Sequence, residues 1–280
     1  MRRPELSLGL SPGLNYLEVM PRLSVVTVTF NDLEGLKSTR ASLLASRNAD
    51  YEHIIVDGGS RDGTLDYLRS LGSAATWVSE RDRGPYDGMN KGAALAKGDW
   101  VMFLNSGDTL ASETALAALL AAPAAADIGM IYGDCLSKGK LRKARPLHEL
   151  HQLLEAGNVK TWLRGHPCHQ SVIARADLMK ATPFDLSFKI AADYHWMERL
   201  RSLGHGSLRI DAVICVYQPG GMSARNFLRC TAEWWKVVKL AVGNDPRRKA
   251  YFLRSLRKHA SRRRRARWLA ALKSLFKPWA

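Results

Sequence analysis

The sequence lacks the features that mark a secreted, disulfide-bonded or membrane-spanning chain. Its 280 residues include four cysteines, which are scattered and contain no CxxC pair. This spacing argues against a disulfide framework or a zinc site and favours a reducing compartment. Arg2 and Arg3 are not followed by a continuous apolar stretch, so we predict no secretory signal. No uncharged apolar run approaches the roughly 20 residues needed to span a bilayer. We therefore expect a cytoplasmic protein.

Acidic residues are scarce at one end of the chain only. From Arg225 to the C-terminus, 17 Lys and Arg residues stand against Glu233 and Asp245, whereas the first 224 residues carry 25 basic and 24 acidic groups. The body is therefore nearly neutral, and the tail holds most of the net charge of +16. We predict an N-terminal extension over 1–20, a main domain over 21–224 and a basic tail over 225–280. Met20 is an alternative start.

The tail has the pattern of a basic amphipathic helix. The run RRRRAR (262–267) precedes five apolar residues at helical spacing: Trp268, Leu272, Leu275, Phe276 and Trp279. Such a helix suits an anionic membrane surface, although a nucleic acid would attract the same charge and many charge runs are merely solvated. Since the body is neutral and shows no nucleic-acid fold, we expect peripheral docking at the inner face of the plasma membrane and no nucleic-acid partner.

The first half alternates between strand and helix patterns. Strands are predicted at 24–30, 51–56, 75–80, 100–104 and 128–133. Asn31 and Glu34 resemble a capping box, Pro85 suits the first turn of a helix reaching Lys97, and 111–126 reads as a surface helix. The second half is less regular, with helices near 148–155 and 191–200 and strands near 169–175 and 208–217. This order predicts an α/β fold with an open, mostly parallel sheet flanked by helices.

Polar side chains follow each of the first four predicted strands. They are Thr29 and Asn31, Asp57 and Ser60, Glu80 and Asp82, and Asn105 and Asp108. An open α/β sheet binds ligands at the carboxyl ends of its strands, so these groups are expected to share one site. A single aspartate after a strand is usually a helix cap, but four strand ends together favour a common function.

Six ordered motifs carry a family resemblance over about residues 23–221. They are SVVTVTFND (24–32), VDGGSRDGT (56–64), SERDRGPYDGMNKG (79–92), GDWVMFLNSGD (98–108), HQS (169–171) and AADYHW (191–196). Together they resemble the inverting family 2 glycosyltransferases with the GT-A fold, and most closely the bacterial branch that builds exopolysaccharide and O-antigen units, of the colanic-acid type. The resemblance implies a nucleotide-sugar half over 21–135 and an acceptor half over 136–224.

The resemblance implies a donor site in the first half. Asp57 would bind the nucleobase, with Thr29, Asn31 and Ser60 around the nucleoside and Asp82 at the ribose or near the metal. Asp87 and Asn90 would line the donor sugar, and Lys91 would reach the diphosphate. Two simpler interpretations remain open. Asp57 can serve only to cap the turn that follows it, and Lys91 can be a solvated residue on the surface of its helix.

The resemblance also implies a divalent cation, Mg²⁺ or Mn²⁺, held by a DxD-like motif after the fourth strand. Here the motif reads NSGD, so Asn105 replaces the first carboxylate and Asp108 remains anionic. An asparagine still offers a neutral oxygen to a hard cation.

Asp193, in AADYHW, matches the general base of the family, and its alternative role is to stabilise a helix N-terminus. His169 is expected at the diphosphate or the acceptor. His166, Cys168 and His169 also suggest a metal site, but Pro167 interrupts them and no second ligand cluster is evident.

We therefore expect a glycosyltransferase that uses a nucleoside-diphosphate sugar and a glycan or polyprenyl-linked acceptor, in cell-surface polysaccharide biosynthesis. The alternatives are a sugar nucleotidyltransferase, whose Gly-rich triphosphate loop is missing from FNDLEGLKS, and a non-catalytic membrane- or nucleic-acid-binding protein.

Overall fold

A computed structural model of the protein describes residues 23–258, apart from residues 124, 219 and 256. The predicted extension over 1–20 and the predicted amphipathic helix over 268–279 lie outside the described residues. Within the described part of the chain, no helix is long and apolar enough to cross a membrane.

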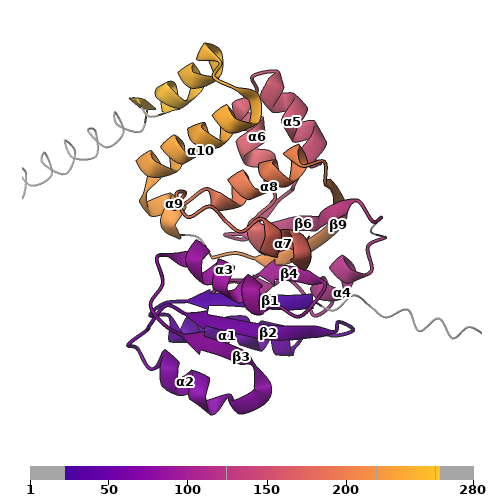
Figure 1. Ribbon diagram of the computed structural model, residues 1–280, viewed down its shortest axis with the longest axis vertical. Coiled ribbons are helices and arrows are strands. Elements are labelled where there is room, and N and C mark those ends of the chain that lie inside the picture. The colour runs from indigo at the N-terminus through magenta and orange to yellow at the C-terminus, as the bar shows by residue number, and fades with distance from the viewer. Residues whose placement is uncertain (1–22, 124, 219, 256, 259–280) are drawn as a thin grey trace, which may run out of the picture.

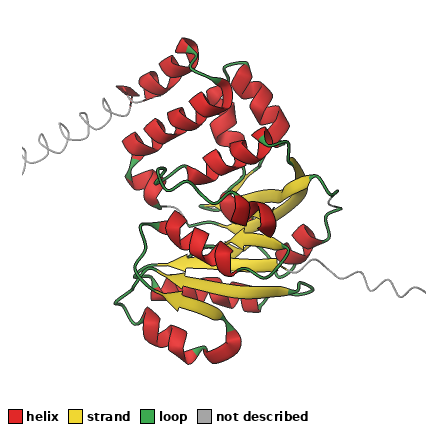
Figure 2. Cartoon of the chain, in the orientation of Figure 1, coloured by secondary structure: helices red, strands yellow, loops and turns green. Residues whose placement is uncertain are grey.

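A nine-stranded mixed sheet forms the centre of the molecule (Figure 2). The strands are β1 (Leu23–Thr29), β2 (Tyr51–Asp57), β3 (Thr76–Ser79), β4 (Trp100–Phe103), β5 (Thr109–Leu110), β6 (Ile128–Ser137), β7 (Lys140–Arg142), β8 (Val172–Arg175) and β9 (Gly206–Val216). Their order is β3-β2-β1-β4-β8-β6-β9-β5, with β7 paired to β6. The first four strands are mutually parallel, whereas β8 is antiparallel to both β4 and β6. The predicted α/β fold is confirmed.

Helices cover both faces of this sheet (Figure 1). They are α1 (Leu33–Leu44), α2 (Thr64–Ser70), α3 (Pro85–Leu95), α4 (Ala115–Leu120), α5 (Leu147–Glu155), α6 (Val159–Gly165), α7 (Ala176–Ala181), α8 (Ala192–Ser202), α9 (Met222–Arg225) and α10 (Phe227–Val242). Successive β1 side chains point to opposite faces of the sheet. Val26 and Val28 pack with α3, whereas Leu23 and Val25 pack with α1 and α4.

Three local predictions differ from the structure. Asp32, and not Asn31, caps α1, because its carboxylate accepts the Gly35 N–H while Asn31 adopts a left-handed φ of 50°. The segment His169–Ser171 forms a 3₁₀ turn before β8 begins. The alanine-rich stretch predicted as a helix and its exit over 111–126 gives only the six-residue α4, in which Ala115, Leu116, Leu119 and Leu120 are buried and not on the surface.

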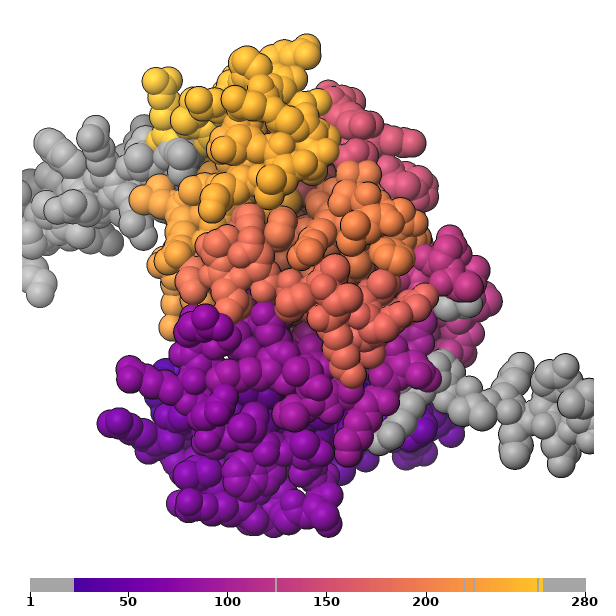
Figure 3. All heavy atoms as spheres, in the orientation of Figure 1, coloured from indigo at the N-terminus to yellow at the C-terminus, as the bar shows by residue number. Residues whose placement is uncertain are grey.

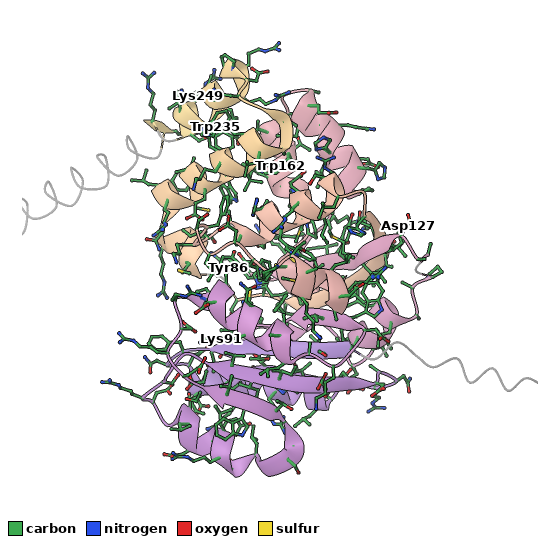
Figure 4. All side chains as sticks on the ribbon, in the orientation of Figure 1. Tyr86, Lys91, Asp127, Trp162, Trp235 and Lys249 are labelled. Carbon is green, nitrogen blue, oxygen red and sulfur yellow. The ribbon has the colours of Figure 1, made fainter. Side chains whose placement is uncertain are left out.

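Helices α5, α6, α8 and α10 lie together at one end of the molecule, above the sheet in Figure 1. Helix α10 begins inside the stretch that the sequence assigns to a separate tail. Its Val237 and Val238 are nevertheless fully buried in the larger core, with Trp162 of α6 and Trp196 of α8. Trp162 and Trp235 both lie within this group of helices in Figure 4. Helix α10 therefore belongs to the body of the protein.

A buried glutamate of α10 holds the segment that leads into α8. The Glu233 carboxylate accepts the N–H groups of Lys189, Ile190 and Ala191 at 2.7–3.1 Å, and Arg229 also donates to it. Burial raises the pKa of Glu233, but these hydrogen bonds outweigh burial and lower it below 4.5. Helix α10 thus fixes the start of α8, where Asp193 lies.

We predict that Glu233→Gln lowers the free energy of unfolding at pH 7 by about 1–3 kcal/mol, because a charged acceptor of several N–H groups becomes neutral. A lowered pKa means that Glu233 stabilises the fold above pH 4.5 and that this contribution is lost as the pH falls through the folded-state value. The variant should therefore lose less stability between pH 6 and pH 3, in denaturant titrations, than the wild type does. Glu34→Gln, at a side chain 83% exposed, is the matched control. Equal acid sensitivity of Glu233→Gln and wild type would contradict this role.

Candidate active site

The carboxyl ends of three parallel strands bring several of the predicted polar side chains together. Thr29, Asp57 and Ser79 are neighbours in register across β1, β2 and β3. Asp57 is fully buried and accepts hydrogen bonds from the Ser60 N–H and hydroxyl and, at 2.6 Å, from the Ser79 hydroxyl. The Asn31 N–H donates to the Ser60 hydroxyl at 2.7 Å. The structure thus brings Thr29, Asn31, Asp57 and Ser60 together, as expected from the sequence.

A large cleft of about 840 Å³ includes Asp32, which follows β1, in its lining, whereas Thr29, Asp57, Ser60 and Ser79 are not part of that lining. The predicted residues that line it are Asn105, Asp108, His169 and Asp193. Asn105 and Asp108 come from the turn between β4 and β5. His169 comes from the turn before β8, and Asp193 from the first turn of α8. In Figure 3 the N-terminal elements form the lower body and the orange and yellow C-terminal elements the upper one. Residues of both bodies line the cleft.

His169 connects the two sides of the cleft. Its Nε2 lies 3.2 Å from Nδ2 of Asn105, and its Nδ1 lies 3.2 Å from Oδ2 of Asp193. With the Asn105 amide as donor, Nε2 accepts and the hydrogen of a neutral ring sits on Nδ1, where it donates to the carboxylate. One imidazole thus fixes the orientation of both neighbours.

Asp193 is a buried carboxylate with a second hydrogen-bond donor. The Tyr86 hydroxyl lies 3.1 Å from Oδ1 of Asp193 and 2.8 Å from the carbonyl oxygen of Ile190. Burial, and next the charge of Asp193, raise the pKa of Tyr86 well above 10, so the phenol keeps its proton. The carboxylate is therefore held from two directions while it still lines the cleft.

Asp108 and Asn105 offer oxygen atoms suited to a hard cation. The Asp108 carboxylate is buried and accepts hydrogen bonds from the Gln170 side chain and the Gln218 N–H at 2.7 and 2.8 Å. Burial raises the pKa of Asp108, which those two bonds partly oppose. The Asn105 Oδ1 is buried without a hydrogen-bond partner among the described residues. An orphaned amide oxygen and a buried carboxylate in the same turn are the kinds of oxygen ligand that Mg²⁺ or Mn²⁺ prefers.

Asp32 also lines the cleft and was not predicted as a site residue. Its Oδ2 accepts the hydroxyl of Ser106, which lies between Asn105 and Asp108, at 2.7 Å. A second carboxylate of this region thus comes from the N-cap of α1. The signal was present in the motif SVVTVTFND (24–32), whose last residue is Asp32.

None of the eight predicted nucleotide-sugar residues belongs to the cleft lining: Thr29, Asn31, Asp57 and Ser60 lie at the strand ends, and Asp82, Asp87, Asn90 and Lys91 have other partners or neighbours. Asp87 forms an ion pair with Arg83 at 2.9 Å, which lowers its pKa, and both amide atoms of Asn90 bond to the backbone of Phe184. Lys91 pairs with Glu80 at 2.6 Å. In Figure 4 Tyr86 lies at the junction of the two bodies and Lys91 farther into the lower one. Asp82 accepts the Gly84 N–H and lies beside Gly58, next to Asp57.

Cationic side chains line the cleft, although Lys91 is not one of them. They are Arg142 at the end of β7, Lys189 before α8 and Arg225 at the end of α9. None of the three belongs to one of the six sequence motifs, so the sequence did not identify them. Their positive charges suit a diphosphate in the cleft.

The segment GHPCHQS sends its three candidate ligands in different directions. His166 packs between Trp162 and Tyr194, with ring centroids at 4.8 and 4.4 Å, and burial lowers its pKa to about 4. His169 enters the cleft, and Cys168 approaches Cys135 and Cys215, all three sulfur atoms lying within 4.8 Å of one another. The cysteines are scattered along the sequence, but the sheet pairs distant strands and so brings three of the four together, all of them as free thiols.

The molecule combines an α/β sheet that has polar strand ends with a cleft lined by an acidic turn, several cations and a buried carboxylate. This combination is that of a nucleotide-dependent transferase. Residues 24–182 match the model of glycosyl transferase family 2, which is more than half of the chain, so the protein belongs to that family. It is therefore a glycosyltransferase, which decides against the nucleotidyltransferase and non-catalytic alternatives.

Relatives and solved structures agree with this family. The chain is 33% identical over 210 residues to an uncharacterized glycosyltransferase of Mycobacterium tuberculosis, covering 73% of this chain and 78% of that protein. It is 29% identical over 218 residues to a PGL/p-HBAD biosynthesis glycosyltransferase of Mycobacterium bovis, covering 72% and 79%.

The fold resembles that of a mannosyltransferase from Pyrobaculum calidifontis in complex with GDP-Man and Mn²⁺, with a TM-score of 0.62, 17% identity and coverage of 87% and 72%. It also resembles glucosyl-3-phosphoglycerate synthase from Mycobacterium tuberculosis in complex with Mg²⁺ and UDP, with a TM-score of 0.56, 18% identity and coverage of 84% and 86%.

We predict that Mn²⁺ together with UDP or GDP raises the melting temperature of the wild type, and that Asp108→Ala loses this shift, because ligands stabilise only the state that binds them. The affinity for Mn²⁺ should fall at least about tenfold. Asp108→Asn, which keeps a similar shape, should show the same loss with a smaller effect on folding. Asp66→Ala, at a side chain 82% exposed on α2, is the control. Undiminished stabilisation of both Asp108 variants by Mn²⁺ and nucleotide would remove Asp108 from the metal site.

Proposed function

We propose that this protein transfers a sugar, with inversion, from a nucleoside-diphosphate sugar to a hydroxyl group of a glycan or lipid-linked glycan in cell-surface polysaccharide or glycolipid biosynthesis. The observation that carries the proposal is the contact chain from Asn105 through His169 to Asp193. This chain of contacts links the residue proposed as the base to one of the residues proposed at the diphosphate, which supports the proposal. A relative named for PGL/p-HBAD biosynthesis supports a glycolipid acceptor, as the family resemblance supports a bacterial surface glycan.

The nucleoside would bind at the strand ends around Asp57. Each carboxylate oxygen has two lone pairs, so Asp57 can accept an N–H of the base as well as the bonds from Ser60 and Ser79. The Thr29 hydroxyl is buried without a partner among the described residues, and Asn31 lies opposite Ser60. Asp82, beside Gly58, is suited to a ribose hydroxyl.

The diphosphate would lie across Asn105, Asp108 and the cleft cations. Mg²⁺ or Mn²⁺ bound at Asp108 and Asn105 would supply Lewis-acid stabilisation of the leaving diphosphate. Arg142, Lys189 and Arg225 add fixed positive charge to the same cleft. These three residues take the role that the sequence assigned to Lys91, which Glu80 holds elsewhere.

Asp193 would act as the general base. The acceptor hydroxyl gives its proton to the carboxylate while its oxygen bonds to the anomeric carbon, and the bond from that carbon to the diphosphate oxygen breaks on the opposite side. Tyr86 and His169 each donate a hydrogen bond to Asp193 and so aim it into the cleft. One displacement of this kind inverts the anomeric configuration.

We predict that Asp193→Asn lowers kcat by about 10²–10⁴-fold, because the amide cannot take the proton, while donor binding is unchanged. The measurement is nucleoside diphosphate release over a panel of UDP-, GDP- and dTDP-sugars, with a membrane lipid extract as the source of acceptor. Asp50→Asn, at an exposed site remote from the cleft lining, is the matched control. Transfer at the wild-type rate by Asp193→Asn would show that another group is the base.

The basic C-terminal segment would dock the enzyme on an anionic membrane surface, where a polyprenyl-linked acceptor is located. Large apolar side chains are exposed along this part of the chain: Leu228 is 53%, Leu240 68% and Leu253 50% exposed. Lys236 and Lys239 are exposed on the same helix, α10. Apolar groups next to basic ones are the combination that binds the surface of anionic bilayers.

We predict that the protein co-sediments with vesicles containing anionic lipid and much less with neutral vesicles. Replacing the four arginines at 262–265 by serine should weaken binding at least about tenfold, because each basic residue near such a surface contributes roughly 1 kcal/mol. Added salt should weaken wild-type binding more than binding of the variant. Equal binding to neutral and anionic vesicles, or a preference for an oligonucleotide over both, would contradict this docking.

A further inference from the structure

Three of the four cysteines form a cluster beside the cleft. Cys135 of β6 and Cys215 of β9 are register partners in adjacent parallel strands, and Cys168 precedes the turn at His169–Ser171. Their sulfur atoms all lie within 4.8 Å of one another. Cys135 and Cys215 are at most 1% exposed, while Cys168 is partly exposed and lines the cleft. The cluster thus has two buried thiols and one that solvent reaches.

A cation stands next to the three thiols. Arg142 is the register partner of Cys135 across the hairpin of β6 and β7, and its guanidinium interacts electrostatically with Cys135 and Cys168. Three thiolates around a divalent ion carry a net charge of −1, which an adjacent guanidinium balances. A buried charge needs such a partner, because desolvation is otherwise costly.

We propose that Cys135, Cys168 and Cys215 bind one thiophilic metal ion, for which Zn²⁺ is the best match. Zinc bonds to cysteine sulfur at about 2.3 Å, so tetrahedral ligands lie roughly 3.8 Å apart, and the three thiols need to approach by at most about 1 Å. The fourth position faces the cleft on the side of Cys168 and is left for water or another small ligand. Binding releases the three thiol protons to solvent.

This thiol site is chemically distinct from the oxygen site at Asp108. Mg²⁺ and Mn²⁺ prefer carboxylate and amide oxygen, whereas thiolate selects zinc and softer ions. The two sites are nevertheless connected, because the Cys168 thiol donates to Oε1 of Gln170 and Nε2 of Gln170 donates to Asp108. A metal on Cys168 removes the first of these hydrogen bonds. The site goes beyond the proposed sugar transfer and does not depend on it.

The test is metal binding to the reduced, metal-free protein. We expect wild type to bind one Zn²⁺ per chain against a chromophoric chelator, and Co²⁺ to give a thiolate-to-metal charge-transfer band. Cys168→Ala and Cys135→Ala should each lose the band and at least about a hundredfold in Zn²⁺ affinity. Cys168→Ala, at the partly exposed position, keeps the test valid if the buried Cys135→Ala fails to fold.

Two further variants serve as controls. Cys230→Ala alters a buried cysteine outside the cluster and should bind Zn²⁺ as wild type does. Asp108→Ala should also bind Zn²⁺ as wild type does, which separates the thiol site from the oxygen site and from the proposed function. No Zn²⁺ binding by reduced wild type, or unchanged binding by Cys168→Ala, would overturn the proposal.

Discussion

The His169 imidazole contacts Asn105 with one nitrogen and Asp193 with the other, and the candidate active site depends on this pair of contacts. Asn105 belongs to the parallel half of the sheet, and Asp193 to a helix that follows some 90 residues later. Because the ring is rigid, the two contacts constrain how far apart Asn105 and Asp193 lie across the cleft. Because His169 contacts the amide nitrogen of Asn105, the amide oxygen Oδ1 has no hydrogen-bond partner among the described residues and is free to bind a cation.

The second wall of the cleft requires the helices at the far end of the molecule. Glu233 of α10 holds the backbone before α8, and Tyr86 of α3 reaches across to the carbonyl oxygen of Ile190 and to Asp193. Asp193, the proposed base, is therefore positioned by segments from both halves and from the stretch that resembles a tail. A chain ending at 224 would lack Glu233, so the catalytic body extends farther than the charge pattern suggests.

Much of the donor side was predictable from the sequence because it follows from local rules. Apolar β-branched runs become buried strands, and parallel strands end at one edge, so Thr29 and Asp57 had to be neighbours. Asp87, Asn90 and Lys91 lie in an equally suggestive motif, yet they bond to Arg83, Phe184 and Glu80. A motif gives the residue, but the helix rotation decides which way its side chain points.

The sequence by itself determined the α/β fold, the family and the position of Asp57 at a strand end, and it identified Asn105, Asp108 and Asp193 as candidates, because each follows from periodicity or an ordered motif. Only the tertiary structure decided that Arg142, Lys189 and Arg225 supply the positive charge and that Cys135, Cys168 and Cys215 meet. These groups come from separate strands and turns, and strand order across a sheet is a long-range property. No local pattern encodes which distant side chains it brings together.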